Sequence, residues 1–185
     1  MQYFITYVLG HRSDSGKKAQ LGTIVHKVME CLASCQKRLQ DKPQKSMYIE
    51  DDALGKINFT PKSLLTKTFV SKLLTKSYEH YTQNCIHKYT GADIKFCRGA
   101  TEIALSYNDG QFDPRKRNIV DAEPQFDILI EEPWAKYKYK TPDGKTVEGQ
   151  LAIKGTIDLV TQVSDDTIEV IDWKTGKRLN WATGE

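Results

Sequence analysis

Two short stretches near the end of the chain decide its fold: GTIDLV at residues 155–160 and VIDWKTG at residues 170–176. Each has the pattern of an apolar strand that carries one acidic residue, Asp158 in the first and Asp172 in the second. A carboxylate is costly among residues that a sheet normally buries, unless it binds a metal or takes part in chemistry. The two stretches therefore predict a functional site on neighbouring strands.

Strand geometry places three of these side chains together. Residues two apart on a strand point to the same face, so Asp172 and Lys174 project together. If residues 155–163 pair with residues 167–173 across the short turn between them, Asp158 lies near Asp172. An Asp-x-Lys pair is more commonly a solvated face, but the apolar flanks of both carboxylates make a catalytic site an equal alternative.

Two carboxylates at close range repel each other unless a divalent cation lies between them. Oxygen ligands favour Mg²⁺ or Mn²⁺ over zinc. A lysine beside such a cation can orient or help to deprotonate a water molecule, and can stabilise the charge that develops on a phosphorane. Asp158, Asp172, Lys174 and a metal ion together are suited to phosphodiester hydrolysis.

The rest of the sequence predicts helices first and strands later. Helical spacing of apolar residues predicts helices over 21–39, 62–89 and 94–107, whereas residues 46–60 are expected to be irregular. Alternation and turn residues predict a strand over 125–130 and a hairpin of residues 134–140 with 147–153. In that hairpin lysines alternate with mostly aromatic residues, which either stack nucleic-acid bases or, more often, pack against a core or a helix.

Composition limits the class of protein. The chain has 185 residues, of which 39% are hydrophobic and 28% charged, and this is typical of a soluble domain with a real core. The formal net charge of +3 is small, so only local clusters could form a nucleic-acid surface. The four cysteines include no CxxC pair, which argues against a disulfide framework or a zinc ribbon. No secretory signal or membrane-length apolar run is present, so we expect a soluble, cytoplasmic protein without a membrane partner.

Three motifs occur in a fixed order along the chain. A helical G-x-x-x-H motif comes first, in the stretch LGTIVHKVME at residues 21–30, and it contains Gly22 and His26. A G-x-x-D motif ending at Asp158 and a strand ending in DWKTG follow. In this order the sequence resembles the PD-(D/E)XK nuclease superfamily, and specifically its RecB-like exonuclease branch.

The resemblance implies a role for each matching residue. Asp158 and Asp172 would bind Mg²⁺ or Mn²⁺. The backbone carbonyl of Trp173 and the side chain of His26 would be further metal ligands. Lys174 would be the catalytic lysine.

Residues around the motifs are expected to have supporting roles. Glu30 lies one helical turn from His26 on the same face, so it either orients the histidine or a water molecule, or is a solvated helix residue. Basic residues before the sheet and after the lysine strand would follow DNA phosphates, with solvated surface charge as the alternative for each cluster. These basic residues are Arg115, Lys116, Arg117, Lys177 and Arg178.

The resemblance also implies an α+β fold with an α/β restriction-endonuclease-like core, in which a central mixed or antiparallel sheet joins an N-terminal histidine helix and a helical insertion. We expect one nuclease-like domain over residues 1–185, with the histidine helix at 21–40, the helical insertion at 45–110 and the catalytic sheet at 120–180. In the family a further helix and strand follow the lysine strand. The chain is therefore expected to be truncated after residue 185, with a missing C-terminal segment or a partner protein completing the site.

The implied function is divalent-metal-dependent hydrolysis of DNA, by an exonuclease of recombination, repair or phage DNA metabolism in a bacterial or phage-infected cell. The 185-residue chain alone is then expected to show weak hydrolysis or none. A catalytically incomplete nuclease-fold module that binds DNA or supports an assembly is the alternative, and a structural metal-binding protein is a third. A nuclease assay with and without divalent cations separates the first from the other two.

Overall fold

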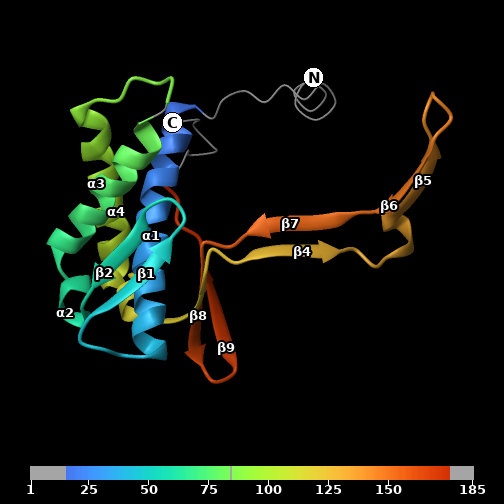
Figure 1. Cartoon of the computed structure of the whole chain (residues 1–185). Helices are drawn as coiled ribbons and strands as arrows, with labels where there is room; N and C mark the ends of the chain where they lie inside the picture. Colours follow the sequence, from blue (N-terminus) through green and yellow to red (C-terminus); the bar gives the residue numbers. More distant parts are fainter. Residues whose placement is uncertain (1–15, 84, 176–185) are drawn as a thin grey trace, which may run out of the picture.

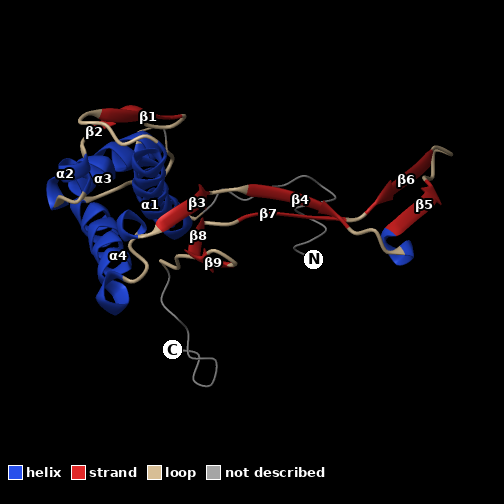
Figure 2. Cartoon of the chain, turned by 90° about the horizontal axis from the view of Figure 1, so that it is seen from below, coloured by secondary structure: helices blue, strands red, loops and turns tan. Residues whose placement is uncertain are grey.

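Helix α1 (Lys17–Asp41) is the element around which the chain folds. The computed structural model describes residues 16–83 and 85–175, and in it α1 packs against helices on one side and a small sheet on the other (Figures 1 and 2). The expected apolar spacing is confirmed, because Leu21, Val25, Val28 and Leu32 are all buried. The helix ends two residues before Pro43, which cannot continue it.

Three further helices cover one side of α1: α2 (Pro61–Leu64), α3 (Lys67–Thr82) and α4 (Gly91–Gly110). The single helix expected over 62–89 is therefore wrong. It is interrupted at Thr66, whose side chain accepts a hydrogen bond from the Phe69 N–H and caps α3. Thr60 and Ser63 cap α2 in the same way, with each side chain bonded to the backbone N–H of the other.

A hairpin precedes α2 at residues that were expected to be irregular. Strands β1 (Met47–Asp51) and β2 (Gly55–Phe59) pair antiparallel, so residues 46–60 are not irregular and the insertion at 45–110 is not purely helical. The Asp51 carboxylate makes the turn, because it accepts hydrogen bonds from the N–H groups of Ala53 and Leu54.

A three-stranded antiparallel sheet lies against the other side of α1. It contains β3 (Asn118–Ala122), β8 (Leu159–Ser164) and β9 (Thr167–Ile171) in the order β3-β8-β9, with Leu159 paired to Ile171. The turn expected between the last two strands is confirmed. The expected partner strand over 155–163 is divided, however, because residues 152–156 pair with residues 125–129 in a separate sheet.

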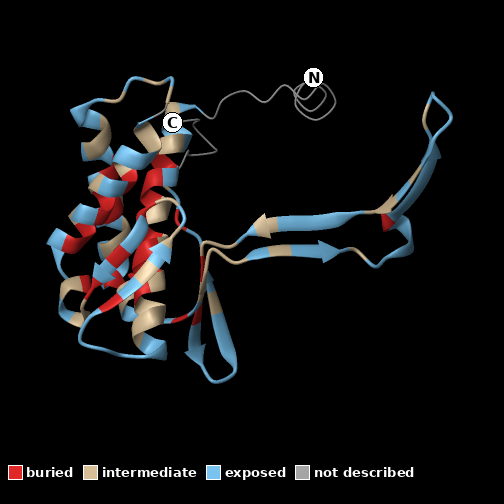
Figure 3. Ribbon diagram, viewed as in Figure 1, coloured by how far each residue is buried: buried red, intermediate tan, exposed pale blue. Residues whose placement is uncertain are grey.

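The remaining strands form an arm that projects from the helices and the small sheet (Figures 1 and 2). In its stem, β4 (Gln125–Leu129) pairs with β7 (Ala152–Thr156). At its tip, β5 (Lys136–Lys140) pairs with β6 (Thr146–Gln150), after the short 3₁₀ turn Pro133–Ala135. The predicted hairpin of 134–140 with 147–153 is thus confirmed at its centre, and Figure 3 shows that most of the arm is exposed.

The α+β class is confirmed, with helices and several small antiparallel sheets in place of one central sheet. The four cysteines are free thiols, as the sequence indicated. None of the helices within residues 16–83 and 85–175 is long and apolar enough to cross a membrane.

Candidate active site

The helix and the sheet meet at His26 and Asp158. The His26 Nδ1 atom lies 3.2 Å from Asp158 Oδ1, although the two residues are 132 positions apart in the chain. Both side chains are largely buried, with 24% and 14% of their surface exposed. Because a carboxylate only accepts hydrogen bonds, Nδ1 carries the proton in this contact, and a neutral ring then keeps its lone pair on Nε2.

The same carboxylate also connects to the second motif. Asp158 Oδ2 accepts a hydrogen bond of 2.7 Å from the backbone N–H of Trp173. The Asp158 side chain is therefore fixed by two bonds, one to the helix and one to the segment that follows β9. Trp173 itself is buried with 7% exposure, so the segment is anchored on its inner face.

The outer face of that segment carries the other two predicted residues. Ile171 and Trp173 are buried whereas Asp172 and Lys174 are exposed, as the two-residue period predicts. Lys174 Nζ donates a 2.8 Å hydrogen bond to Asp172 Oδ1. This bond, followed by the attraction of Asp172 and then of Asp158, raises the pKa of Lys174, so the side chain is an ammonium at neutral pH.

The structure thus arranges the four residues as two pairs. Asp158 directly precedes β8 and Asp172 directly follows β9, so the pairing of Leu159 with Ile171 places the two acidic residues opposite each other. Their carboxylates have different partners, however: His26 for the first and Lys174 for the second. Within the described part of the chain no three His, Cys, Asp or Glu side chains form a group that could hold a metal ion.

Two motif glycines have steric explanations. A Cβ atom at Gly22 of α1 would lie 2.9 Å from Thr175 Oγ1, so the glycine allows the end of the DWKT segment to approach the helix. A Cβ at Gly155 would lie 2.5 Å from the ring of Phe126, its partner across β4 and β7. Both glycines permit close contacts that bring the motif segments into place.

Glu30 belongs to a charged group next to the candidate site. Its carboxylate forms a 2.5 Å ion pair with Lys27, and Lys27 in turn lies 3.3 Å from Asp51 of the β1–β2 turn. Burial raises the pKa of Glu30, Lys27 opposes this shift, and the negative charge of Glu123 adds to it. The structure therefore gives Glu30 a contact with Lys27, and its expected role beside His26 stays a prediction. Asp51 was missed because nothing in its local sequence signals a buried carboxylate.

The basic residues expected to follow DNA differ from one another. Arg115 forms a two-pronged ion pair with the buried Asp113, with N···O distances of 2.8 and 2.7 Å, and Arg117 pairs with Glu169. Their charges are thus matched inside the molecule. Lys116 is exposed, and its DNA contact stays a prediction. Lys177 and Arg178 lie outside the described residues.

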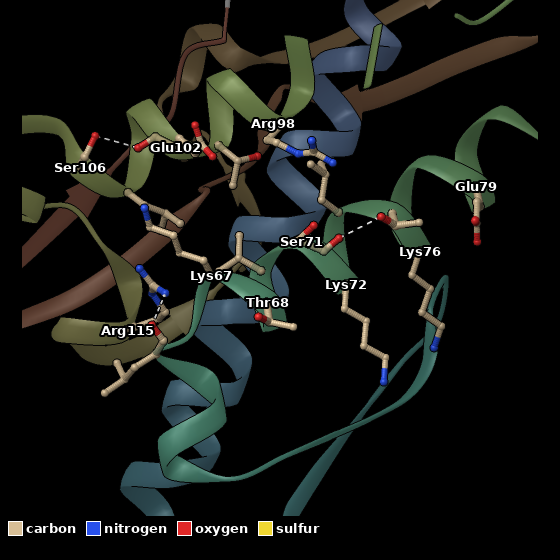
Figure 4. Close-up of a pocket in the computed structure, with 16 residues that line it drawn as sticks. Lys67, Thr68, Ser71, Lys72, Lys76, Glu79, Arg98, Glu102, Ser106 and Arg115 are labelled. Carbon is tan, nitrogen blue, oxygen red and sulfur yellow. Dashed lines mark hydrogen bonds between the residues drawn. The ribbon is translucent and has the colours of Figure 1, made fainter. Parts of the chain in front are cut away.

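A groove of about 1220 Å³ lies between α3 and α4, away from the His26–Asp158 pair (Figure 4). Val70 and Leu74 are among its lining residues, and Figure 4 shows Lys72 and Lys76 extending side by side from α3. Apart from Arg115, its lining includes none of the predicted site residues. The groove is therefore separate from the candidate active site.

The donors at the candidate site are of the type that Mg²⁺ or Mn²⁺ takes. They comprise the two carboxylates, the carbonyl of Trp173 and one imidazole, with no thiolate among them. An ammonium group is already positioned beside one of the carboxylates. These donor types suit a hard cation, but among the described residues the three side chains do not form one group around a common point.

A family model described as the PD-(D/E)XK nuclease superfamily matches residues 1–184 of the chain. No curated protein and no solved structure matches it. The family match includes all three motifs and both pairs of residues described above. The chain therefore belongs to the PD-(D/E)XK nuclease superfamily.

Proposed function

We propose that the protein is a divalent-metal-dependent DNA nuclease, of the RecB-like exonuclease type, acting in recombination, repair or phage DNA metabolism. Membership of a nuclease superfamily supports DNA as the substrate. The observation that carries the proposal is the Asp158 carboxylate, which bonds to His26 of α1 and to the N–H of Trp173. This carboxylate joins the histidine helix, characteristic of the RecB-like resemblance, to the segment that carries the lysine.

Each residue then has a distinct task. Asp158 and Asp172 hold Mg²⁺ or Mn²⁺, with His26 and the Trp173 carbonyl as the remaining protein ligands. When bound, such an ion supplies Lewis-acid activation of the phosphate and lowers the pKa of a water molecule. Lys174 keeps its proton and places a positive charge where negative charge develops on the phosphate.

One observation favours the alternative of a catalytically incomplete module that binds DNA. Asp172 is bonded to Lys174, and among the described residues it forms no three-ligand group with His26 and Asp158. A module of this kind would bind DNA with a strong dependence on salt and would not cleave it.

The test is hydrolysis of end-labelled linear DNA in Mg²⁺, in Mn²⁺ and in EDTA, with circular DNA as a substrate without ends. Lys174→Ala should lower the rate about 10²–10³-fold, as expected for loss of one well-placed charge donor. Lys95→Ala is the matched control, since Lys95 is an exposed lysine of α4 away from the site. Asp172→Asn should weaken Mn²⁺ binding measured by calorimetry.

Three results would contradict the proposal. Binding of DNA without cleavage in any divalent cation would support the non-catalytic module. Cleavage unaffected by Lys174→Ala would show that the chemistry lies elsewhere. Cleavage of circular DNA at the rate of linear DNA would exclude the exonuclease type.

A further inference from the structure

The arm begins at the candidate active site. The N–H of Glu123 donates a 3.1 Å hydrogen bond to the backbone oxygen of Asp158, and the N–H of Ile157 donates one of 3.1 Å to Pro124. These two bonds close the base of the arm directly beside the carboxylate that contacts His26. Gly149 of the tip is nine positions from Asp158 in the chain, which is at most about 30 Å of extended strand.

One face of the tip is aromatic, and no other described part of the chain covers it. Tyr137 and Tyr139 lie on this face, with their ring centres 6.2 Å apart and 42% and 55% of their surfaces exposed. Tyr137 is paired across the hairpin with Gly149, where a Cβ atom would lie 2.4 Å from the tyrosine hydroxyl. The hydroxyl end of the Tyr137 ring therefore lies over the glycine, which leaves room for it. Within the described residues, these two rings pack against neither a core nor a helix, the alternative expected for such a stripe.

The opposite face of the same strand carries lysines. Lys136, Lys138 and Lys140 alternate with the tyrosines, and Lys138 is paired with Glu148 at 2.8 Å. Within the described residues, neither Lys136 nor Lys140 has an acidic partner. Residues 136–150 contain four lysines against two acidic residues, so the tip is positive.

We propose that this tip, hairpin β5–β6, is a binding platform for single-stranded DNA of the substrate. Outward-facing rings offer stacking surfaces to any base, and nearby lysines attract the phosphates. A base presents a free face only when it is unstacked, so a single strand fits this surface better than a duplex. The hairpin is two strands wide, with about 4.8 Å between them, so the long lysine side chains reach round its edges to a strand on the aromatic face.

This inference rests on the proposed function in one respect: the strand bound at the tip is taken to be the DNA substrate of the nuclease. At about 3.4 Å per nucleotide, the distance from Asp158 to the tip corresponds to roughly nine nucleotides of stacked strand. A strand held at the active site should therefore reach the tip only if it is longer than this. The dependence on strand length distinguishes the arm from the active site.

The experiment measures binding of fluorescent dT30, dT4 and a 30-base-pair duplex by anisotropy, in EDTA so that no hydrolysis occurs. The double variant Tyr137→Ala/Tyr139→Ala should weaken dT30 binding at least tenfold, or about 1.4 kcal/mol, and leave dT4 unchanged. The double variant Tyr137→Phe/Tyr139→Phe keeps the rings and should bind dT30 normally. Tyr107→Ala is the matched control, because Tyr107 is an exposed tyrosine of α4 outside the arm.

Several outcomes would overturn the inference. The first is unchanged affinity of the alanine variant for dT30. The second is an equal loss of affinity for dT4 and for dT30. The third is a duplex that binds as tightly as dT30 and loses the same affinity in the alanine variant. A dimer that dissociates in the alanine variant, seen by light scattering, would show that the tip contacts a second copy instead. Tip-dependent binding without hydrolysis in Mg²⁺ or Mn²⁺ would contradict the nuclease proposal alone, whereas hydrolysis with tip-independent binding would contradict this inference alone.

Discussion

Replacing Gly22 by alanine tests whether the histidine helix and the lysine segment are held in close contact. Alanine is favoured over glycine inside a helix by about 1 kcal/mol. At this position, however, the new Cβ would lie 2.9 Å from Thr175 Oγ1, whereas ordinary contacts begin at 3.4 Å, so Thr175 must move by 0.5 Å. Overpacking of this kind costs about 1–3 kcal/mol. The expected net effect is between no change and about 2 kcal/mol of destabilisation.

The matched control is Gly99→Ala in α4, where a Cβ would meet nothing within 4 Å. This variant should gain about 1 kcal/mol, or roughly 2–4 °C in Tm for a chain of this size. Urea unfolding followed by circular dichroism measures both variants. In a nuclease assay Gly22→Ala should lose about tenfold in rate, because Lys174 is next to the displaced residue.

Thr175→Ala removes the Oγ1 atom that the new Cβ would meet. Added to Gly22→Ala, it should restore both stability and rate. Equal stabilisation by Gly22→Ala and Gly99→Ala would refute the argument, because the helix and the segment would then have room for a methyl group between them.

Three other variants test features of the fold. Asp113→Ala leaves the Arg115 guanidinium without its buried partner and should cost about 3–5 kcal/mol in urea unfolding, whereas Lys116→Ala next to it should be neutral. Burial raises the pKa of Glu30 above its usual value of 4.5, so ionisation of Glu30 opposes folding as the pH rises through that range. The stability of Glu30→Gln relative to the wild type should therefore increase between pH 4.5 and neutral pH, and an unchanged difference would contradict the burial argument. Thr66→Ala should cost about 1 kcal/mol of stability through loss of the α3 cap, whereas a continuous helix over 62–89 would be stabilised.

Strong local signals predicted much of the fold. The turn at residues 164–166 and the turn at 142–145 both connect the expected antiparallel strands. Helix α1 was expected because its apolar spacing is regular. The β1–β2 hairpin was missed, although Gly55, which ends its turn with a φ of 63°, was a signal for it; the Asp51 side-chain bonds to the backbone that complete the turn could not be read from the sequence. The division of residues 155–163 between two sheets depends on strand pairing over long range, which alternation alone does not specify.

In the candidate site, too, the features that depend on neighbouring residues were predicted, and the contacts between distant residues were not. Sequence spacing predicted that Asp172 and Lys174 share a face, because this follows from the strand period. It did not predict that Asp158 would bond to the N–H of Trp173, since a backbone donor leaves no trace in the sequence. The role expected for Arg115 at a DNA surface also ignored Asp113, which is 1% exposed and binds the guanidinium.

The long sequence separation between His26 and Asp158 has a consequence for synthesis. Ribosomes add about 5–20 residues per second, so the 132 positions between them take roughly 7–26 s to translate. Before that interval ends, α1, α3 and α4 are complete and can pack through Ile24 and Leu74, while Asp158 and Asp172 do not yet exist. The nascent chain therefore acquires its helical core before it acquires the candidate site, which is complete only once Lys174 has been added.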